Sequence, residues 1–171
     1  AVAASLDPSK KINIYNQMAQ ILVGFDETGT VRKFDRDGDL TDGTKLNEVF
    51  FVNFARLLTK DEIKKQSFTI QVQTGSTVTG PPSDTLTISD HGALNSYKVN
   101  SPTGEYGILY TGSAAAEGSG VGLIYYQAGI CVLTASIFDG DASNYIGPNG
   151  ANGATANYDN VGDLLVSGSI S

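Results

Sequence analysis

The first part of the chain carries apolar residues at the three- and four-residue spacing of a helix. Asp7 suits the N-cap, Pro8 suits the first helical position because its missing N–H costs nothing there, and Gly24 suits the C-cap. We therefore expect a helix over residues 8–23. Its apolar side chains are expected to pack into the core rather than to hold a cofactor: Ile12, Ile14, Tyr15, Met18, Ala19 and Leu22.

Beyond this helix, turn-forming residues separate short runs in which apolar and polar positions alternate. Residues 24–43 are turn-rich and include a predicted hairpin around 27–29. A capping box formed by Thr59 and Glu62 predicts a short helix that reaches about Lys65. Strands are expected at residues 49–57, 68–73, 85–89, 97–99 and 105–111, with loops at 74–83 and 112–120.

The strongest β pattern lies at residues 121–138. Two runs rich in β-branched and aromatic residues flank a short Gly-containing turn at 127–129, which predicts a hairpin. Both arms are apolar on both faces, so the hairpin is expected at the centre of a sheet that is covered on two sides. The predicted fold is α+β, with one antiparallel or mixed β-sheet around this hairpin and the 8–23 helix packed on it. Residues 139–162 are predicted to form a long Gly- and Asn-rich loop before a last strand that starts at 164–166.

Composition narrows the classes of protein that this fold can serve. A length of 171 residues with 40% apolar residues predicts a single domain, 1–171. The absence of a starting Met and the apolar end at Ile170 lead us to expect a segment of a longer chain. A net charge of -7 without a basic patch argues against nucleic acid as a partner, and no apolar run is long enough for a membrane-spanning helix. One Cys and one His exclude an internal disulfide, a multi-cysteine zinc site and a His-pair metal centre.

An acidic run suggests one candidate for metal binding. Asp35, Asp37 and Asp39 alternate along the chain, and three carboxylates at such positions can converge on calcium. An EF-hand loop, however, needs Gly at its sixth position and Glu at its twelfth, where this chain has Leu40 and Leu46. We therefore favour an acidic, solvated turn and leave calcium as the alternative.

Candidate catalytic groups are few and scattered. His91 lies between Asp90 and Gly92, but no Gly-x-Ser-x-Gly elbow accompanies them, so a surface turn is expected. Cys131 lies within an apolar strand and is expected to be buried and inert. Glu105 and Glu117 would have to face each other to act as a glycosidase pair. No catalytic, cofactor-binding or metal-binding residue is therefore predicted, and no cofactor is expected.

Three segments carry a family resemblance. They are Tyr15-Asn16-Gln17-Met18-Ala19-Gln20, the stretch from Phe51 to Lys65 that contains Arg56-Leu57-Leu58-Thr59-Lys60-Asp61-Glu62, and the stretch from Val121 to Phe138 that contains the Tyr125-Tyr126-Gln127-Ala128-Gly129 turn and the Val132-Leu133-Thr134 return strand. Together they resemble a recurring module in large virion structural proteins of contractile-tailed phages, especially those that infect marine cyanobacteria. The resemblance covers residues 7–138 and continues weakly beyond them. The tyrosine-rich hairpin is its most specific part.

The resemblance implies a building block rather than an enzyme, and the family offers no catalytic residues to carry over. It implies a virion component of the tail, baseplate or neck that assembles with other virion proteins and with copies of itself as a homo-oligomer, and that is present in the host cytoplasm during assembly. The same composition suits an extracellular adhesin or carbohydrate-binding module that uses Tyr145 or Tyr158. A third possibility is a tail-associated hydrolase built on Glu105 or on Asp90 and His91.

Overall fold

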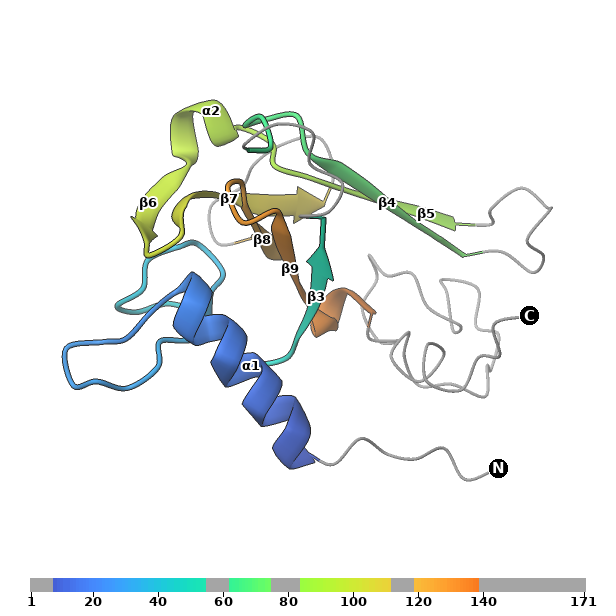
Figure 1. Ribbon diagram of the computed structural model, residues 1–171. Helices are drawn as coiled ribbons and strands as arrows, with labels where there is room; N and C mark the ends of the chain where they lie inside the picture. Colours follow the sequence, from blue (N-terminus) through green and yellow to red (C-terminus); the bar gives the residue numbers. More distant parts are fainter. Residues whose placement is uncertain (1–7, 55–61, 75–83, 112–118, 139–171) are drawn as a thin grey trace, which may run out of the picture.

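The computed structural model describes residues 8–54, 62–74, 84–111 and 119–138 (Figure 1). Several predictions from the sequence lie outside these residues and stay predictions. They concern the Asp7 cap, the end of the 49–57 strand, Thr59, the loops at 75–83 and 112–118, the long loop at 139–162 and the strand at 164–166.

Seven strands form one sheet in the order β3-β9-β8-β7-β5-β4, and β6 pairs with β7 outside this path. All of these pairings are antiparallel. The strands are β3 (Val49–Asn53), β4 (Thr69–Thr74), β5 (Asp84–Ser89), β6 (Lys98–Ser101), β7 (Gly104–Thr111), β8 (Gly122–Tyr125) and β9 (Ile130–Thr134). The prediction of an α+β fold around an antiparallel sheet is confirmed.

The predicted central hairpin is also confirmed, with one difference. Strands β8 and β9 pair with each other and lie between β7 and β3, and nearly all of their residues are buried. The second arm, however, ends at Thr134, and Ala135–Phe138 form the 3-10 helix η2. The Thr134 hydroxyl accepts the Ser136 N–H at 3.5 Å, and Ala135 donates its N–H to the Glu48 carbonyl oxygen. These bonds turn the backbone away from the sheet.

Helix α1 (Pro8–Leu22) ends as predicted, because Gly24 adopts a φ of +83° and donates its N–H to the Ala19 carbonyl oxygen at 2.9 Å. Ala19 and Leu22 are buried in the core. The prediction that Ile12 and Ile14 join them is wrong, because both side chains are more than half exposed. Successive residues differ by about 100° around the helix axis, which turns Ile14 away from the core. Ile12 lies seven residues before the buried Ala19, on the same side of the helix, so this angle does not explain its exposure.

The sheet has an apolar cluster on each face, because neighbouring strand residues point to opposite sides. The first cluster contains Leu123, Tyr125 and Val132 and is covered by α1 and by the small sheet of β1 (Phe34–Asp35) and β2 (Lys45–Leu46). The second contains, among others, Ile88, Ala93, Leu109, Ile124, Tyr126, Cys131, Leu133 and Ile137. The two clusters bury both faces of the central hairpin, as its apolar pattern predicts.

Strands β4 and β5 form an arm that extends away from the rest of the sheet (Figure 1). They pair with each other at six positions, from Thr69–Ser89 to Thr74–Asp84, whereas β5 meets β7 only at Ile88–Thr111 and Ser89–Tyr110. Strand pairing therefore joins the arm to the central strands at its base, and Ile70 and Leu86 of the arm also pack against the second cluster.

The segment before this arm differs from the prediction. Residues 62–65, the described end of the expected helix, are not helical, and Gln66 has a φ of +60°. Ile63 donates its N–H to the Tyr126 carbonyl oxygen at 3.1 Å, a tertiary bond that replaces the local bonds of a helix. The one-turn helix α2 (Ala93–Ser96), which follows Gly92, was not predicted. None of the described helices is long and apolar enough to cross a membrane.

Candidate functional site

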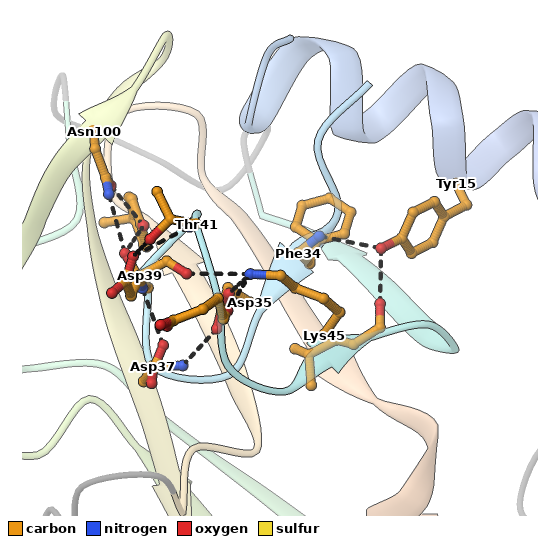
Figure 2. A network of polar contacts seen from close by, with 12 residues as sticks. Tyr15, Phe34, Asp35, Asp37, Asp39, Thr41, Lys45 and Asn100 are labelled. Atoms are coloured by element: carbon orange, nitrogen blue, oxygen red, sulfur yellow. Dashed lines mark hydrogen bonds and ion pairs between the residues drawn. The ribbon is translucent and has the colours of Figure 1, made fainter. Parts of the chain in front are cut away.

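The acidic run begins at Asp35, the last residue of β1, and continues into the loop that leads to β2, and α1 holds both ends of that loop (Figure 2). The Tyr15 hydroxyl donates to the Leu46 carbonyl oxygen at 2.7 Å and accepts the Phe34 N–H at 3.1 Å. The Tyr15 and Phe34 rings also meet edge to face, with centroids 5.3 Å apart. One helical side chain therefore joins the strands on either side of the loop.

The carboxylates of the alternating aspartates accept hydrogen bonds from nearby backbone N–H groups. Asp35 accepts the Asp37 N–H at 3.2 Å, Asp37 accepts the Asp39 N–H at 3.0 Å, and Asp39 accepts the Thr41 N–H at 3.1 Å. Each carboxylate thus caps the backbone two residues further on, which is the turn chemistry typical of Asp. The spacing that suggested calcium ligands is explained by three consecutive turns.

Lys45 supplies a positive charge to the same loop. Its ammonium group forms an ion pair with the Asp35 carboxylate and donates to the carbonyl oxygens of Asp39, at 3.2 Å, and of Asp42. Figure 2 shows this group among the loop oxygens. Within the described residues, no group of three His, Cys, Asp or Glu side chains is arranged to hold a metal ion.

Burial distinguishes Asp35 from the other two aspartates of the loop. The prediction of a solvated turn holds for Asp39, which is exposed, but not for Asp35, which is 0% exposed. Desolvation raises the pKa of Asp35, although its bond to Lys45 opposes that shift. The pKa of Asp37 is lowered by the Asp39 N–H, and that of Asp39 by the Thr41 side chain.

A second buried carboxylate, Asp90, lies between the arm and the central hairpin. One of its oxygens accepts the Gln66 N–H at 2.6 Å and the Tyr126 hydroxyl at 3.0 Å, and the other accepts the Phe68 N–H at 3.0 Å. Desolvation raises its pKa, and these hydrogen bonds oppose the shift. Three donors thus occupy the carboxylate, and the neighbouring His91 is exposed to solvent in its turn, as predicted. The arrangement ties chain segments together and does not resemble a catalytic dyad.

Glu105 lies close to the same tyrosine but has a different partner. Its carboxylate forms an ion pair with Lys65, whose ammonium lies 4.9 Å from the centroid of the Tyr97 ring and 5.9 Å from that of Tyr126. The bond to Glu105 raises the pKa of Lys65. Glu117, the other candidate carboxylate, lies outside the described residues, so the suggested pair has one described member.

Cys131 is buried in β9, as predicted, and burial raises the pKa of its thiol to about 12. A thiol in this state is a poor nucleophile at neutral pH.

No protein-family model, curated protein or solved structure matches the chain. A functional proposal therefore depends on the residues themselves and on the resemblance stated from the sequence.

Sequence reasoning missed the most exposed apolar side chains. Three of them lie on α1, one follows it, and three lie on α2, the residue after it and β6; they are Ile12, Ile14, Ile21, Phe25, Leu94, Tyr97 and Val99. The sequence did contain one signal for the exposed apolar residues of α1. The helix has more apolar positions than a single buried stripe needs, with Ile14 and Ile21 seven residues apart.

Proposed function

We propose that this chain is a non-enzymatic structural component of a tailed-phage virion. It assembles through protein–protein contacts in the tail, baseplate or neck, with other virion proteins and with copies of itself. The resemblance of the 121–138 hairpin and the two earlier segments to phage virion modules is the starting point of this proposal.

The observation that carries the proposal is how charged and apolar groups are distributed. Asp35 and Asp90 are buried, and their carboxylate oxygens accept hydrogen bonds from backbone N–H groups and, for Asp35, from Lys45. Neither carboxylate is therefore presented to a substrate. Large apolar side chains, by contrast, are exposed on α1 and around α2. Exposed apolar groups gathered on one element are typical of a surface that is covered by another protein.

An extracellular carbohydrate-binding module is the second candidate, and one observation favours it. Tyr97 is 39% exposed next to Leu94 and Val99 in the sequence, and an exposed tyrosine ring can stack on a sugar. Glycan binding that is lost in Tyr97→Ala, and retained in Phe25→Ala, would favour this candidate over the virion component.

Two measurements test the proposal directly. Sedimentation velocity of the full chain over a range of concentrations should show multimers, and mass spectrometry of purified particles should detect the chain in a constant ratio to other tail proteins. A chain that stays monomeric at high concentration and is absent from purified particles would overturn the proposal.

A further inference from the structure

The outer side of α1 carries a strip of residues that the described part of the molecule leaves uncovered. This outer strip consists of Lys10, Ile14, Gln17, Met18 and Ile21, which follow one another at spacings of three, four and seven along one face of the helix. Ile14 is 53% exposed and Ile21 is 58% exposed, whereas Met18 is half-buried at the edge of the core. The strip lies beside the buried face formed by Tyr15, Ala19 and Leu22, so α1 has two apolar sides and the core uses one.

The charges near α1 are the reverse of what an isolated helix prefers. Lys10 and Lys11 lie close to its N-terminus, there is no acidic residue in the first turn, and there is no basic residue in the last turn. Asp26 and Glu27 follow shortly after its C-terminus. A helix is stabilised by negative charge at its N-terminus and positive charge at its C-terminus. Asp7 suits the N-cap, but Lys10 and Lys11 near the start of α1 and Asp26 and Glu27 after its end have the unfavourable sign.

We infer that the outer strip binds the outer strip of a second copy of this chain, with the two α1 helices antiparallel about a two-fold axis close to Gln17 and Met18. In this arrangement Ile14 of each copy lies opposite Ile21 of the other. Lys10 and Lys11 at the start of one helix then lie opposite the acidic turn, Asp26 and Glu27, that follows the helix of the other copy. The helix has 15 residues, about 22 Å at 1.5 Å per residue, so both charged ends lie within reach of the contact.

Charge complementarity is the reason for choosing a second copy as the partner. The basic residues lie on α1 and the acidic residues lie in the turn that follows it, so a two-fold axis pairs them twice, as an isologous interface requires. The chain as a whole has a net charge of -7, so two copies repel each other unless a basic group such as the Lys10–Lys11 pair lies in the contact. The antiparallel arrangement also aligns the two helix dipoles favourably.

The contact is expected to be weak on its own. A stable interface buries roughly 1,600 Å² in total, more than one face of two short helices provides. In a particle, many copies held close together make such a contact effective through high local concentration. The inference rests on the proposed function, because it names the surface through which copies of the chain would meet.

A cysteine cross-link tests the geometry. Gln17 is exposed and lies near the inferred axis, so Gln17→Cys should form a disulfide-linked dimer under mild oxidation. The matched control is Asn16→Cys, which is also exposed but is turned about 100° around the helix, away from the strip. Cys131 is buried and should not react in either variant. Equal cross-linking of the two variants, or of neither, would overturn the inference.

Sedimentation of charge and apolar variants tests the energetics. Ile14→Glu/Ile21→Glu should weaken self-association about tenfold or more, with an unchanged melting temperature. Lys10→Glu/Lys11→Glu should also weaken it, and adding Glu27→Lys should restore part of it, since one of the two acidic residues across the axis is then basic.

The same experiment separates this inference from the proposed function. Multimers that persist in the Ile14→Glu/Ile21→Glu variant would overturn the α1 contact and leave a virion role standing on another surface. A fall of several degrees in the melting temperature without a change in association would mean that the same chain covers the strip, which also overturns the inference. Absence of any association of the wild-type chain, with absence from particles, would overturn both proposals.

Discussion

Asp35 and Asp90 are both buried, but the chain stabilises them in different ways. Asp35, the last residue of β1, is paired with the ammonium of Lys45, which lies opposite it on β2. Asp90 is surrounded by neutral donors, two backbone N–H groups and the Tyr126 hydroxyl. The conformation around Asp35 therefore depends on one side chain, that of Lys45. The carboxylate of Asp90 keeps its donors only if three chain segments are correctly positioned. Asp35 therefore stabilises local structure, and Asp90 stabilises contacts between segments that are distant in the sequence.

The largest effect is expected from removing Asp90. Asp90→Ala leaves the buried Tyr126 hydroxyl and two part-buried backbone N–H groups without their acceptor. An unsatisfied buried group costs about 1–3 kcal/mol and water can partly satisfy the other two, so we expect a loss of about 4 kcal/mol in the free energy of unfolding. Urea denaturation measures the loss. His91→Ala, at the exposed neighbouring residue, is the control and should change the free energy by less than about 0.5 kcal/mol. Similar values for the two variants would mean that Asp90 does not join the segments.

Removing the ammonium group of Lys45 should lower the free energy of unfolding by somewhat less than removing Asp90. Lys45→Met leaves Asp35 buried without its ion pair, and we expect a loss of about 3 kcal/mol, since the Lys45 side chain is 25% exposed and water can partly replace the ammonium. Lys33→Met is the matched control, because Lys33 is exposed and, among the described residues, its ammonium bonds to the Asn47 side chain. If both variants unfold at the same urea concentration, the ion pair contributes nothing and the distinction between the two aspartates fails.

A smaller effect is expected from pH. Burial raises the pKa of Asp90 above its ordinary value of 3.8, so in the interval between the two values the folded state binds a proton that the unfolded state releases. Stability from this group therefore falls as pH rises through that interval. Asp26 and Asp39, whose pKa values are lowered by hydrogen bonds, act in the opposite direction below pH 3.8.

Asp90→Asn isolates the contribution of Asp90. The difference in free energy of unfolding between the wild-type protein and this variant should shrink as pH rises from about 4 to about 7. A constant difference across that range would show that Asp90 has the same pKa in the folded and unfolded states.

The smallest effect is expected from calcium. The Lys45 ammonium already lies among the loop oxygens that a cation would use, so added calcium should leave the melting temperature unchanged. Thermal unfolding with calcium and with a chelator checks this. A calcium-dependent rise that is lost in Asp37→Ala would restore the metal-binding interpretation of Asp35, Asp37 and Asp39.

Patterns that depend on neighbours in the chain predicted much of the fold. The central hairpin, the boundaries of α1 and the strands β3, β4, β5 and β7 follow from hydrophobic period and from Gly24, because these signals act over a few residues. The helix expected to reach Lys65 is absent from the described residues 62–65. There Ile63 and Gln66 bond to Tyr126 and Asp90, partners that are distant in the sequence. A capping box cannot reveal such competitors.

The candidate sites were harder to predict for the same reason. Alternate spacing correctly grouped Asp35, Asp37 and Asp39 in one loop, but it could not show that Lys45 folds back onto Asp35. The sequence also could not show which apolar side of α1 faces the core, because Ile14 and Leu22 are equally apolar and only packing distinguishes them. The exposed outer strip follows from that choice.

The narrow base of the β4–β5 arm has a consequence for how the molecule opens. Amide hydrogens in β8 and β9 are enclosed by paired strands on both sides, so they should exchange with solvent only when the whole sheet comes apart. The arm meets β7 at two residue pairs, so few backbone bonds hold it, although Ile88 lies in the second cluster and Ile70 and Leu86 pack against that cluster. Opening of the arm therefore exposes these three side chains and should precede separation of β8 and β9. Asp90 accepts hydrogen bonds from the Gln66 and Phe68 amides just before β4. These bonds then help to determine the equilibrium between the closed and the open arm.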